Sequence, residues 1–95
     1  MTVRWTLRAR DSLEAILLYI AQDDPVAAHA LVDRLIDSTE DTLSAHPMAG
    51  RPGRVSGTRE WVAHQRYIVA YRVTAHGDVD VLDVVHAARL WPERF

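Results

Sequence analysis

The feature that most constrains the fold of this chain is a change in the period of its apolar residues, from two to 3.6 and back to two. Residues 2–7 alternate apolar and polar side chains, as a half-buried strand does. After a helical region, residues 58–64, 67–73 and 79–86 return to β-branched and aromatic residues, and His76-Gly77-Asp78 predicts a hairpin turn between the last two segments. The order predicts an α+β domain, β-α-α-β-β-β, with a helix hairpin packed on one face of a four-stranded, mostly antiparallel sheet.

Two helices are predicted between the first strand and the other three. The first runs from about residue 10 to 22, and Asp11 with Glu14 three positions later resembles a capping box at its start. The second begins at Asp24-Pro25, an N-cap side chain followed by a proline in the first turn, and ends at His46-Pro47. Because the connection between them is very short, the two helices are expected to form an antiparallel hairpin.

The two last strands are apolar on both faces. In the earlier one, Ile68 and Ala70 point away from the tyrosines and valines that alternate with them, and in the later one Leu82 and Val84 are expected to do the same. One helix hairpin can cover only one face of a four-stranded sheet. We therefore expect a second copy or a different protein chain to cover the other face.

Composition limits the chain to one domain, residues 1–95, with a single modest core, since 48% of the residues are hydrophobic. The absence of cysteine excludes disulfides and thiolate metal sites. The five histidines lack the paired spacing of metal ligands, so we expect neither a metal nor a cofactor. The sequence shows no secretory leader pattern and no apolar run of membrane-spanning length, which predicts a cytoplasmic protein without membrane contact.

All 11 basic residues are arginine, and they are unevenly distributed. Residues 1–46 carry four arginines and eight acidic residues, whereas residues 47–76 carry five arginines and Glu60 as the only acid. The absence of lysine excludes a P-loop and Schiff-base chemistry. Because guanidinium groups match phosphate and carboxylate, the basic segment predicts a binding surface, although for any single arginine a solvated ion pair is an open alternative.

Four blocks of the chain resemble the RelE/ParE superfamily of toxins, and together they cover nearly its whole length. They are the opening strand and helix hairpin up to His46-Pro47, the segment from Gly50 to Glu60, the strand YIVAYRV at 67–73 and the ending VVHAAR at 84–89. The last two blocks are the most specific. The resemblance implies the fold predicted above, a toxin of a type II toxin–antitoxin module, and a cognate antitoxin whose C-terminal segment wraps the toxin.

Two targets stay open within this superfamily, because ParE-like members poison DNA gyrase and RelE-like members cut messenger RNA on the ribosome without a metal. Ile68 stands where RelE-like toxins commonly carry an arginine, the ending has no tyrosine, and the chain has no lysine to grip ribosomal RNA. These departures favour inhibition of gyrase. The alternative is a ribosome-dependent mRNA endoribonuclease, with His86 or Glu60 as the base and Arg59 or Arg89 as the cation at the phosphate.

Two sets of site residues follow from these hypotheses. The predicted target-binding residues are Arg51, Arg54, Arg59, His86, Arg89 and Trp91, of which Arg59, His86 and Arg89 are catalytic if the protein is a nuclease. The predicted antitoxin-binding residues are Ile68, Ala70, Arg72, Leu82 and Val84. For His86 and Trp91 a packing role is an open alternative. A small adaptor domain that dimerises through the uncovered sheet face also stays open.

Overall fold

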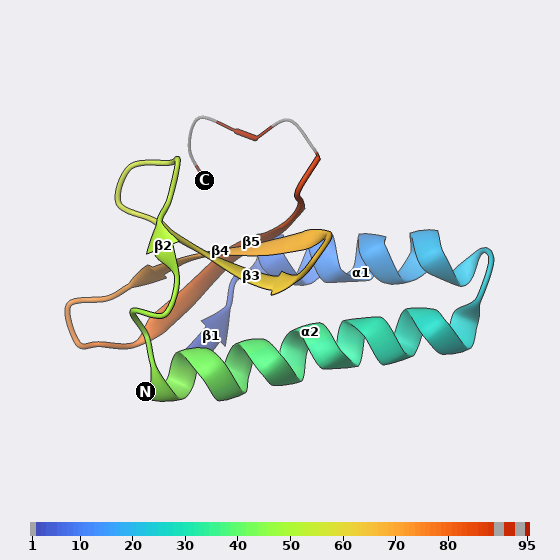
Figure 1. Ribbon diagram of the computed structural model, residues 1–95, viewed down its shortest axis with the longest axis horizontal. Coiled ribbons are helices and arrows are strands. Elements are labelled where there is room, and N and C mark those ends of the chain that lie inside the picture. Colours follow the sequence, from blue (N-terminus) through green and yellow to red (C-terminus); the bar gives the residue numbers. More distant parts are fainter. Residues whose placement is uncertain (1, 89–90, 93–94) are drawn as a thin grey trace.

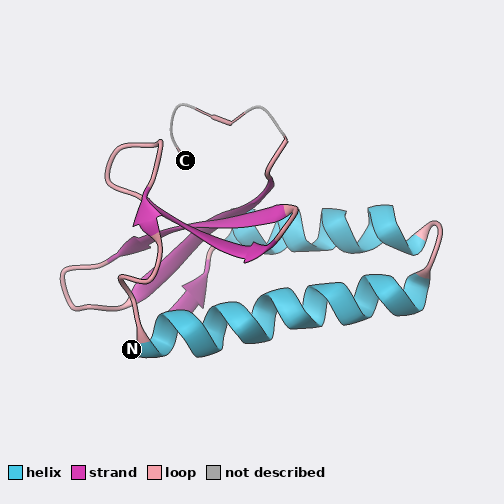
Figure 2. Ribbon diagram, viewed as in Figure 1, coloured by secondary structure: helices cyan, strands magenta, loops and turns pink. Residues whose placement is uncertain are grey.

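The computed structural model of the chain describes residues 2–88, 91–92 and 95. A layer of two helices packs against a twisted sheet (Figures 1 and 2). The elements in chain order are β1 (Val3–Trp5), α1 (Leu7–Ala21), α2 (Pro25–Ala45), β2 (Arg51–Pro52), β3 (Arg59–His64), β4 (Tyr67–Val73) and β5 (Val79–His86). None of the helices in this described part of the chain combines the length and the apolarity that crossing a membrane requires.

The sheet has five strands in the order β1-β5-β4-β3-β2, and only β1 and β5 pair in parallel. The predicted order of elements is confirmed, but the predicted number of four strands is wrong. The additional strand, β2, consists of Arg51 and Pro52, which pair with Glu60 and Arg59 of β3. Two residues are too few to show an alternation, so the apolar pattern carries no signal for such a strand.

The helix α1 begins earlier than its apolar stripe predicted, because Thr6 caps it. The Thr6 Oγ1 accepts a hydrogen bond from the Ala9 N–H at 3.2 Å and donates one to the carbonyl of Val81 at 2.8 Å. The threonine therefore joins the start of α1 to β5 as well as capping the helix. The predicted capping box is wrong, since Asp11 and Glu14 both lie exposed inside the helix.

Both predicted ends of α2 are confirmed. The Asp24 side chain accepts a hydrogen bond from the Ala27 N–H at 3.0 Å, and Pro25 is the first residue of the helix. At the other end the His46 N–H donates to the Thr42 carbonyl at 2.8 Å, and no further turn is made. The two helices lie side by side as an antiparallel hairpin (Figure 1).

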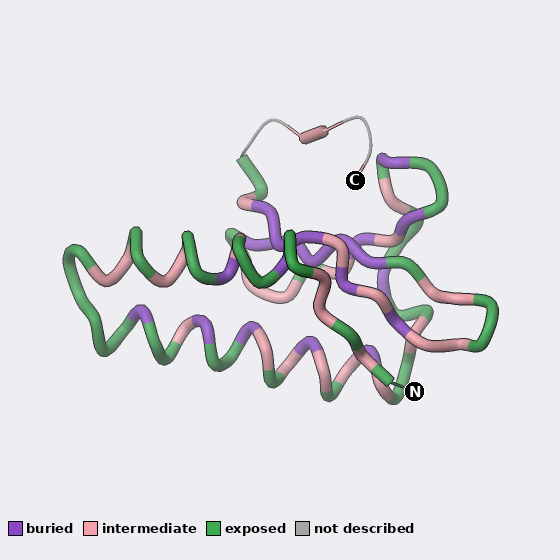
Figure 3. Tube along the Cα trace, turned by 180° about the vertical axis from the view of Figure 1, so that it is seen from behind, coloured by how far each residue is buried: buried purple, intermediate pink, exposed green. Residues whose placement is uncertain are grey.

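The hydrophobic core lies between this hairpin and the sheet. Buried positions recur along one side of α2 (Figure 3). Tyr71 of β4 is the largest side chain that is fully buried there. Its hydroxyl donates to the Pro47 carbonyl at 2.7 Å and accepts from the Gly50 N–H at 2.8 Å, so it ties the segment after α2 to the sheet. The buried residues of the core are Ala9, Leu13, Val32, Leu35, Leu43, Tyr67, Val69, Tyr71, Val79, Val81 and Val84.

A bulge in β5 changes which residues face the helices. The pairing of β4 with β5 skips Leu82, which is an extra residue in β5. Side-chain alternation is shifted beyond it, so Val84 packs in the helix-facing core with Val81. The prediction that Val84 lies on the opposite face is wrong, because it assumed strict alternation along the strand. Val85, which pairs with Ile68, takes that place.

The sheet face turned away from the helices is covered by the chain itself. Ile68, Ala70 and Val85 are exposed by only 6%, 0% and 3%. On this side of the sheet Figure 1 shows the loop between β2 and β3 and the described part of the C-terminal segment, residues 91–92. The expectation that a second chain must cover this face is therefore wrong. An apolar strand face shows only that it is covered, and the chain's own loops can cover it as well as a partner can.

Candidate functional site

Glu60 organises the arginine-rich region of the chain. It lies in β3 opposite Ala70, and its side chain is only 2% exposed. One carboxylate oxygen, Oε1, accepts hydrogen bonds from the Nη2 atoms of Arg51 and Arg54 at 3.2 and 3.4 Å. The other, Oε2, accepts from the Arg54 backbone N–H at 2.7 Å and from its Nε at 3.2 Å. Both oxygens are therefore occupied by donors of β2 and the loop that follows it.

The surroundings of Glu60 keep its carboxyl ionised. Burial by itself raises the pKa of Glu60, but the hydrogen bonds from the backbone and the guanidinium of Arg54, and from Arg51, outweigh this effect. The pKa of Glu60 therefore lies below its ordinary value of 4.5. A carboxylate with a lowered pKa and two occupied oxygens is poorly suited to act as the general base of a nuclease.

The loop between β2 and β3 is closed by Thr58. The Gly53 N–H donates to the Thr58 carbonyl at 2.7 Å, and the Thr58 N–H and Oγ1 donate to the Val55 carbonyl at 3.2 and 2.6 Å. A Cβ atom on Gly53 would collide with the Thr58 Oγ1, so this approach requires glycine. Gly57 has a φ of 77°, in the left-handed region that favours glycine. These hydrogen bonds close the loop and fix the position of the Arg54 backbone within it.

Arg54 and Trp91, which were predicted to share a binding surface, are brought into contact. The Arg54 Cζ lies 3.9 Å from the centroid of the Trp91 ring, a cation–π contact. The Trp91 ring also makes a T-shaped contact with Phe95, at 6.4 Å between centroids and 73° between planes. The guanidinium side chains of Arg51 and Arg54 remain 57% and 46% exposed. Arg51, Arg54 and Trp91 therefore form part of one accessible surface beside the β2–β3 loop.

Arg59 is directed elsewhere. Its Nε and Nη2 donate to the Gly50 carbonyl at 3.0 and 2.6 Å, and Nη2 also donates to the Met48 carbonyl at 3.3 Å. These contacts satisfy carbonyl groups of the segment after α2, next to the hydroxyl of Tyr71. The guanidinium that was predicted to bind a phosphate is therefore engaged in holding the backbone.

His86 is separated from Arg59 by the width of β4 and by four residues along it. Arg59 pairs with Tyr71 and His86 pairs with Tyr67, on the two sides of β4. Four residues of a strand span about 13 Å, so the two predicted nuclease residues do not converge on one phosphate. The third, Arg89, lies outside the described residues.

The ring of His86 packs edge-on against Tyr67, with centroids 5.4 Å apart. Its Nδ1 accepts a hydrogen bond from the Ala88 N–H at 3.1 Å, so in the neutral imidazole the proton is on Nε2. Tyr67 and His86 line a hollow of about 930 Å³ between α1 and the ends of β4 and β5. His86 therefore borders a groove whose lining includes Arg8 but not Arg59.

The predicted antitoxin-binding residues divide into two groups. Arg72 is exposed and Leu82 is half-buried, so both are accessible. Ile68, Ala70 and Val84 are buried within the chain, so a partner cannot reach them without displacing what covers them.

An apolar surface that the sequence pattern missed lies along α1. Leu7, Leu18 and Tyr19 are 69%, 60% and 74% exposed, and Leu7 and Tyr19 border the hollow beside Tyr67 and His86. Their positions fall outside the core stripe of α1, and that is the signal by which they could have been found.

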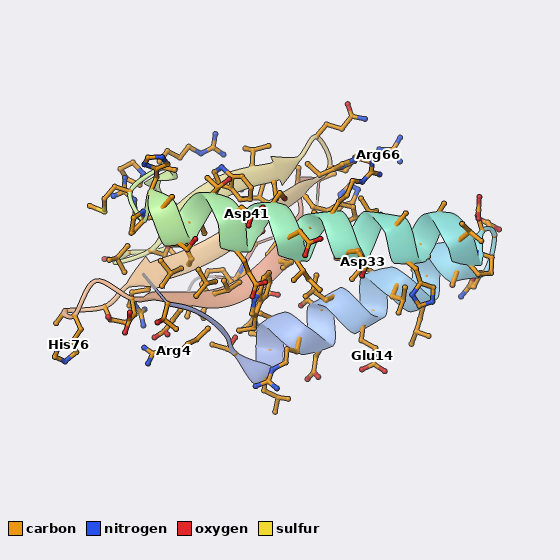
Figure 4. All side chains as sticks on the ribbon, turned by 90° about the horizontal axis from the view of Figure 1, so that it is seen from below. Arg4, Glu14, Asp33, Asp41, Arg66 and His76 are labelled. Carbon is orange, nitrogen blue, oxygen red and sulfur yellow. The ribbon has the colours of Figure 1, made fainter. Side chains whose placement is uncertain are left out.

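Charge is unevenly distributed between the two layers of the molecule, although α1 also carries Arg8 and Arg10 and β5 also carries Asp80 and Asp83. The helical layer carries acidic residues on its outer surface, among them Glu14, Asp33 and Asp41 (Figure 4). The arginines of the basic segment belong to the sheet and its loops, as Arg66 at the β3–β4 turn illustrates. Within the described ranges, no group of three potential ligands is placed to hold a metal ion.

The known proteins that are similar to this chain are toxins or toxin–antitoxin systems. The family model described as the ParE toxin of the type II toxin–antitoxin system parDE matches residues 3–91. The candidate toxin Y4kP of Sinorhizobium fredii is 47% identical over 92 residues, 96% of this chain and 93% of that protein. Toxin RelE2 of Caulobacter vibrioides is 40% identical over 88 residues, 93% of this chain and 97% of that protein. The chromosomal ParDE toxin–antitoxin system of P. aeruginosa has a similar solved structure, with a TM-score of 0.78 and 26% identity over 90% of this chain and 95% of that one.

The helix hairpin on a mixed five-stranded sheet matches the fold of ParE/RelE-type toxins. The family-model match over residues 3–91 is more specific than the shared fold. The chain belongs to the ParE toxin family of type II toxin–antitoxin systems. The resemblance that the sequence showed, above all in the strand at 67–73 and the ending at 84–89, is thereby confirmed.

Proposed function

We propose that this toxin inhibits DNA gyrase without catalysis, through a surface that includes Arg51, Arg54 and Trp91, and that a cognate antitoxin neutralises it. The observation that carries the proposal is the separation of Arg59 from His86. A nuclease needs a base and a cation at the same phosphate. Here Arg59 is bound to backbone carbonyls, and His86 lies across β4 and four residues away along that strand. Arg8, which lines the hollow beside His86, is paired with the Asp83 carboxylate at 3.1 Å.

The surface is suited to binding a protein. A tryptophan stacked on a partly exposed arginine offers a large apolar area together with a charge, and these two residue types dominate the energetics of protein interfaces. Because Glu60 and Thr58 hold Arg54 in place, little side-chain entropy is lost when the surface is covered.

Two assays on purified toxin without antitoxin test the target. We expect inhibition of gyrase supercoiling and no cleavage of ribosome-bound message. Arg54→Gln should weaken inhibition at least about tenfold, the effect of losing one interfacial anchor. The matched control is Arg34→Gln, which removes an exposed arginine from the outer side of α2. Cleavage of message with normal supercoiling would overturn the proposal and make His86 the first candidate for the catalytic base.

The antitoxin is proposed to dock on α1 as well as on Arg72 and Leu82. The similar ParDE structure is named as a toxin–antitoxin system, which supports an antitoxin partner. The exposed Leu7 and Tyr19 beside the hollow of about 930 Å³ offer anchor points for apolar side chains of a partner helix.

This docking is tested by measuring the Kd of the toxin–antitoxin complex. Tyr19→Asp should raise the Kd by at least about tenfold, since it places a charge in an apolar contact. Val26→Asp is the matched control, because Val26 is 81% exposed but lies on α2 and does not border the hollow. An equal effect of the two substitutions would exclude the α1 surface as the docking site.

A further inference from the structure

The described contacts of Trp91 are made by its ring and not by its indole N–H. Its Nε1 is buried, yet no hydrogen-bond acceptor for it exists among the described residues. A buried indole N–H normally finds an acceptor, so the ring lacks the usual polar anchor. The described contacts that locate it are the stack on Arg54 and the edge contact with Phe95. Phe95 belongs to the same terminal segment and lies under the Arg8 guanidinium of α1, with the Arg8 Cζ 5.1 Å from its ring centroid. Arg54 is therefore the contact that joins Trp91 to the β2–β3 loop.

The orientation of the Arg54 guanidinium follows from its bonds to Glu60. The Nε and Nη2 atoms define one edge of the planar group, and they donate to the two oxygens of the Glu60 carboxylate at 3.2 and 3.4 Å. A carboxylate bound to that edge leaves the flat faces of the guanidinium free. The Cζ atom of this group lies over the Trp91 ring, 3.9 Å from its centroid. The backbone N–H of Arg54 also donates to Glu60, at 2.7 Å, so the main chain is located by the same carboxylate.

Arg51 shows that charge pairing alone does not produce this arrangement. Its Nη2 donates to Oε1 of Glu60 at 3.2 Å, so it bonds the same carboxylate as Arg54 does. It makes one hydrogen bond to Glu60 where Arg54 makes three, and within the described part of the chain no aromatic ring stacks on it. The chain therefore contains a natural comparison between an arginine that is only paired and one that is oriented.

We propose that Glu60 is a positioning residue of the toxin: it orients Arg54, and through the Arg54–Trp91 stack it sets the place of the C-terminal segment at residue 91. Glu60 is too buried to be an interfacial contact itself, at 2% side-chain exposure. Its effect on the target rests on the proposed function, in which Arg54 and Trp91 belong to the binding surface. Its effect on Trp91 does not depend on what the target is.

The test uses the full chain labelled with 5-fluorotryptophan, observed by ¹⁹F NMR. The chain has three tryptophans, so three resonances are expected, and Trp91→Phe identifies the one from residue 91. The resonances of Trp5 and Trp61 report whether each variant is folded. We expect Glu60→Gln and Arg54→Gln to move the Trp91 resonance towards its position in the unfolded chain, while the other two stay in place.

The matched control is Arg51→Gln, which removes the other cation from Glu60 and should leave the Trp91 resonance within its linewidth. Arg54→Lys is a second variant, which keeps the charge with a milder change and should still move the resonance, because an ammonium has no flat face. A Trp91 resonance that is unchanged in Arg54→Gln, or that moves equally in Arg51→Gln, would overturn the proposal.

Gyrase inhibition then separates this inference from the proposed function. If Glu60 positions the target surface, Glu60→Gln should weaken inhibition to a similar degree as Arg54→Gln, about tenfold or more. A shifted Trp91 resonance in a toxin that never inhibits gyrase would overturn the proposed function and leave the positioning role standing. Inhibition by the unmutated toxin, with a Trp91 resonance indifferent to Glu60, would overturn the positioning role alone.

Discussion

The hydroxyl of Tyr71 offers a direct test of how the core holds the arginine-rich region, and Tyr71→Phe removes this single oxygen. In the folded chain the ring is fully buried, and the hydroxyl donates to the Pro47 carbonyl and accepts from the Gly50 N–H, at 2.7 and 2.8 Å. Gly50 is closely packed, since a Cβ at this residue would lie 2.7 Å from both the Glu60 carbonyl oxygen and the Tyr71 hydroxyl. The substitution therefore leaves a buried N–H without its partner.

The expected loss of stability follows from these contacts. Each hydrogen bond contributes about 1 kcal/mol net, and a buried donor left unpaired adds a desolvation cost of about 1 kcal/mol or more. We expect Tyr71→Phe to lower the free energy of unfolding by about 2–3 kcal/mol. In a domain of this size the midpoint of thermal unfolding falls by about 4–8 °C per kcal/mol, so a decrease of roughly 8–24 °C is predicted.

Urea denaturation followed by circular dichroism measures this free energy, and Tyr67→Phe is the matched control. Tyr67 is also buried in the core of the same strand, but its hydroxyl has no hydrogen bond to any described residue. Its substitution should change the free energy of unfolding by less than about 0.5 kcal/mol. Amide hydrogen exchange at Gly50 should accelerate in Tyr71→Phe only. Equal losses in the two variants would refute the argument, because removal of a phenolic oxygen would then matter irrespective of its partners.

The remaining predictions concern the loop and its carboxylate. At pH 7, Glu60→Gln should lower the free energy of unfolding by about 2–3 kcal/mol, less than for a wholly buried pair because both arginines are about half exposed. Because the pKa of Glu60 is lowered in the folded chain, its contribution to the free energy of unfolding is complete above the ordinary pKa of 4.5 and is lost as pH falls through the folded-state value. Urea titrations of the unmutated protein and Glu60→Gln should therefore converge in acid. A difference in free energy that persists unchanged to pH 2 would contradict this. Gly57→Ala should lower the free energy of unfolding by about 1 kcal/mol because Gly57 has a φ of 77°. Gly53→Ala should lower it by more, because the added Cβ collides with Thr58. The reverse ranking in the same urea measurement would argue against the closed loop.

Several elements could be predicted from local sequence because their determinants are local. The predicted bounds of β4 and β5 agree with the structure, since β-branched and aromatic residues there are interrupted by the turn at Gly77. The start of α2 is encoded by Asp24 and Pro25, which act within one turn. The start of α1 was missed because Thr6 caps the helix while it also bonds β5, a contact more than seventy residues away in the chain.

The candidate site was only partly predictable for the same reason. Arg51, Arg54 and Trp91 were assigned to a binding surface from charge and residue type, and the structure brings Arg54 and Trp91 together. It separates Arg59 from His86, because the pairing of β3 and β5 with β4 puts them on its two sides and four residues apart along it. Neither the register nor the bulge at Leu82 has a signature in the apolar pattern, since both depend on which residues of a distant strand lie opposite.

By itself, the sequence determined the kind and order of the main elements, a basic middle segment, and a resemblance to toxins that the family match confirms. These properties depend on periodicity, capping residues and composition, which act over a few neighbouring positions. Only the tertiary structure decided that Glu60 binds two arginines, that Arg59 supports the backbone, and that the second face of the sheet is covered within the chain. Each of these outcomes depends on strand register and on packing between segments far apart in the sequence, where a shift of one residue turns a side chain to the other face.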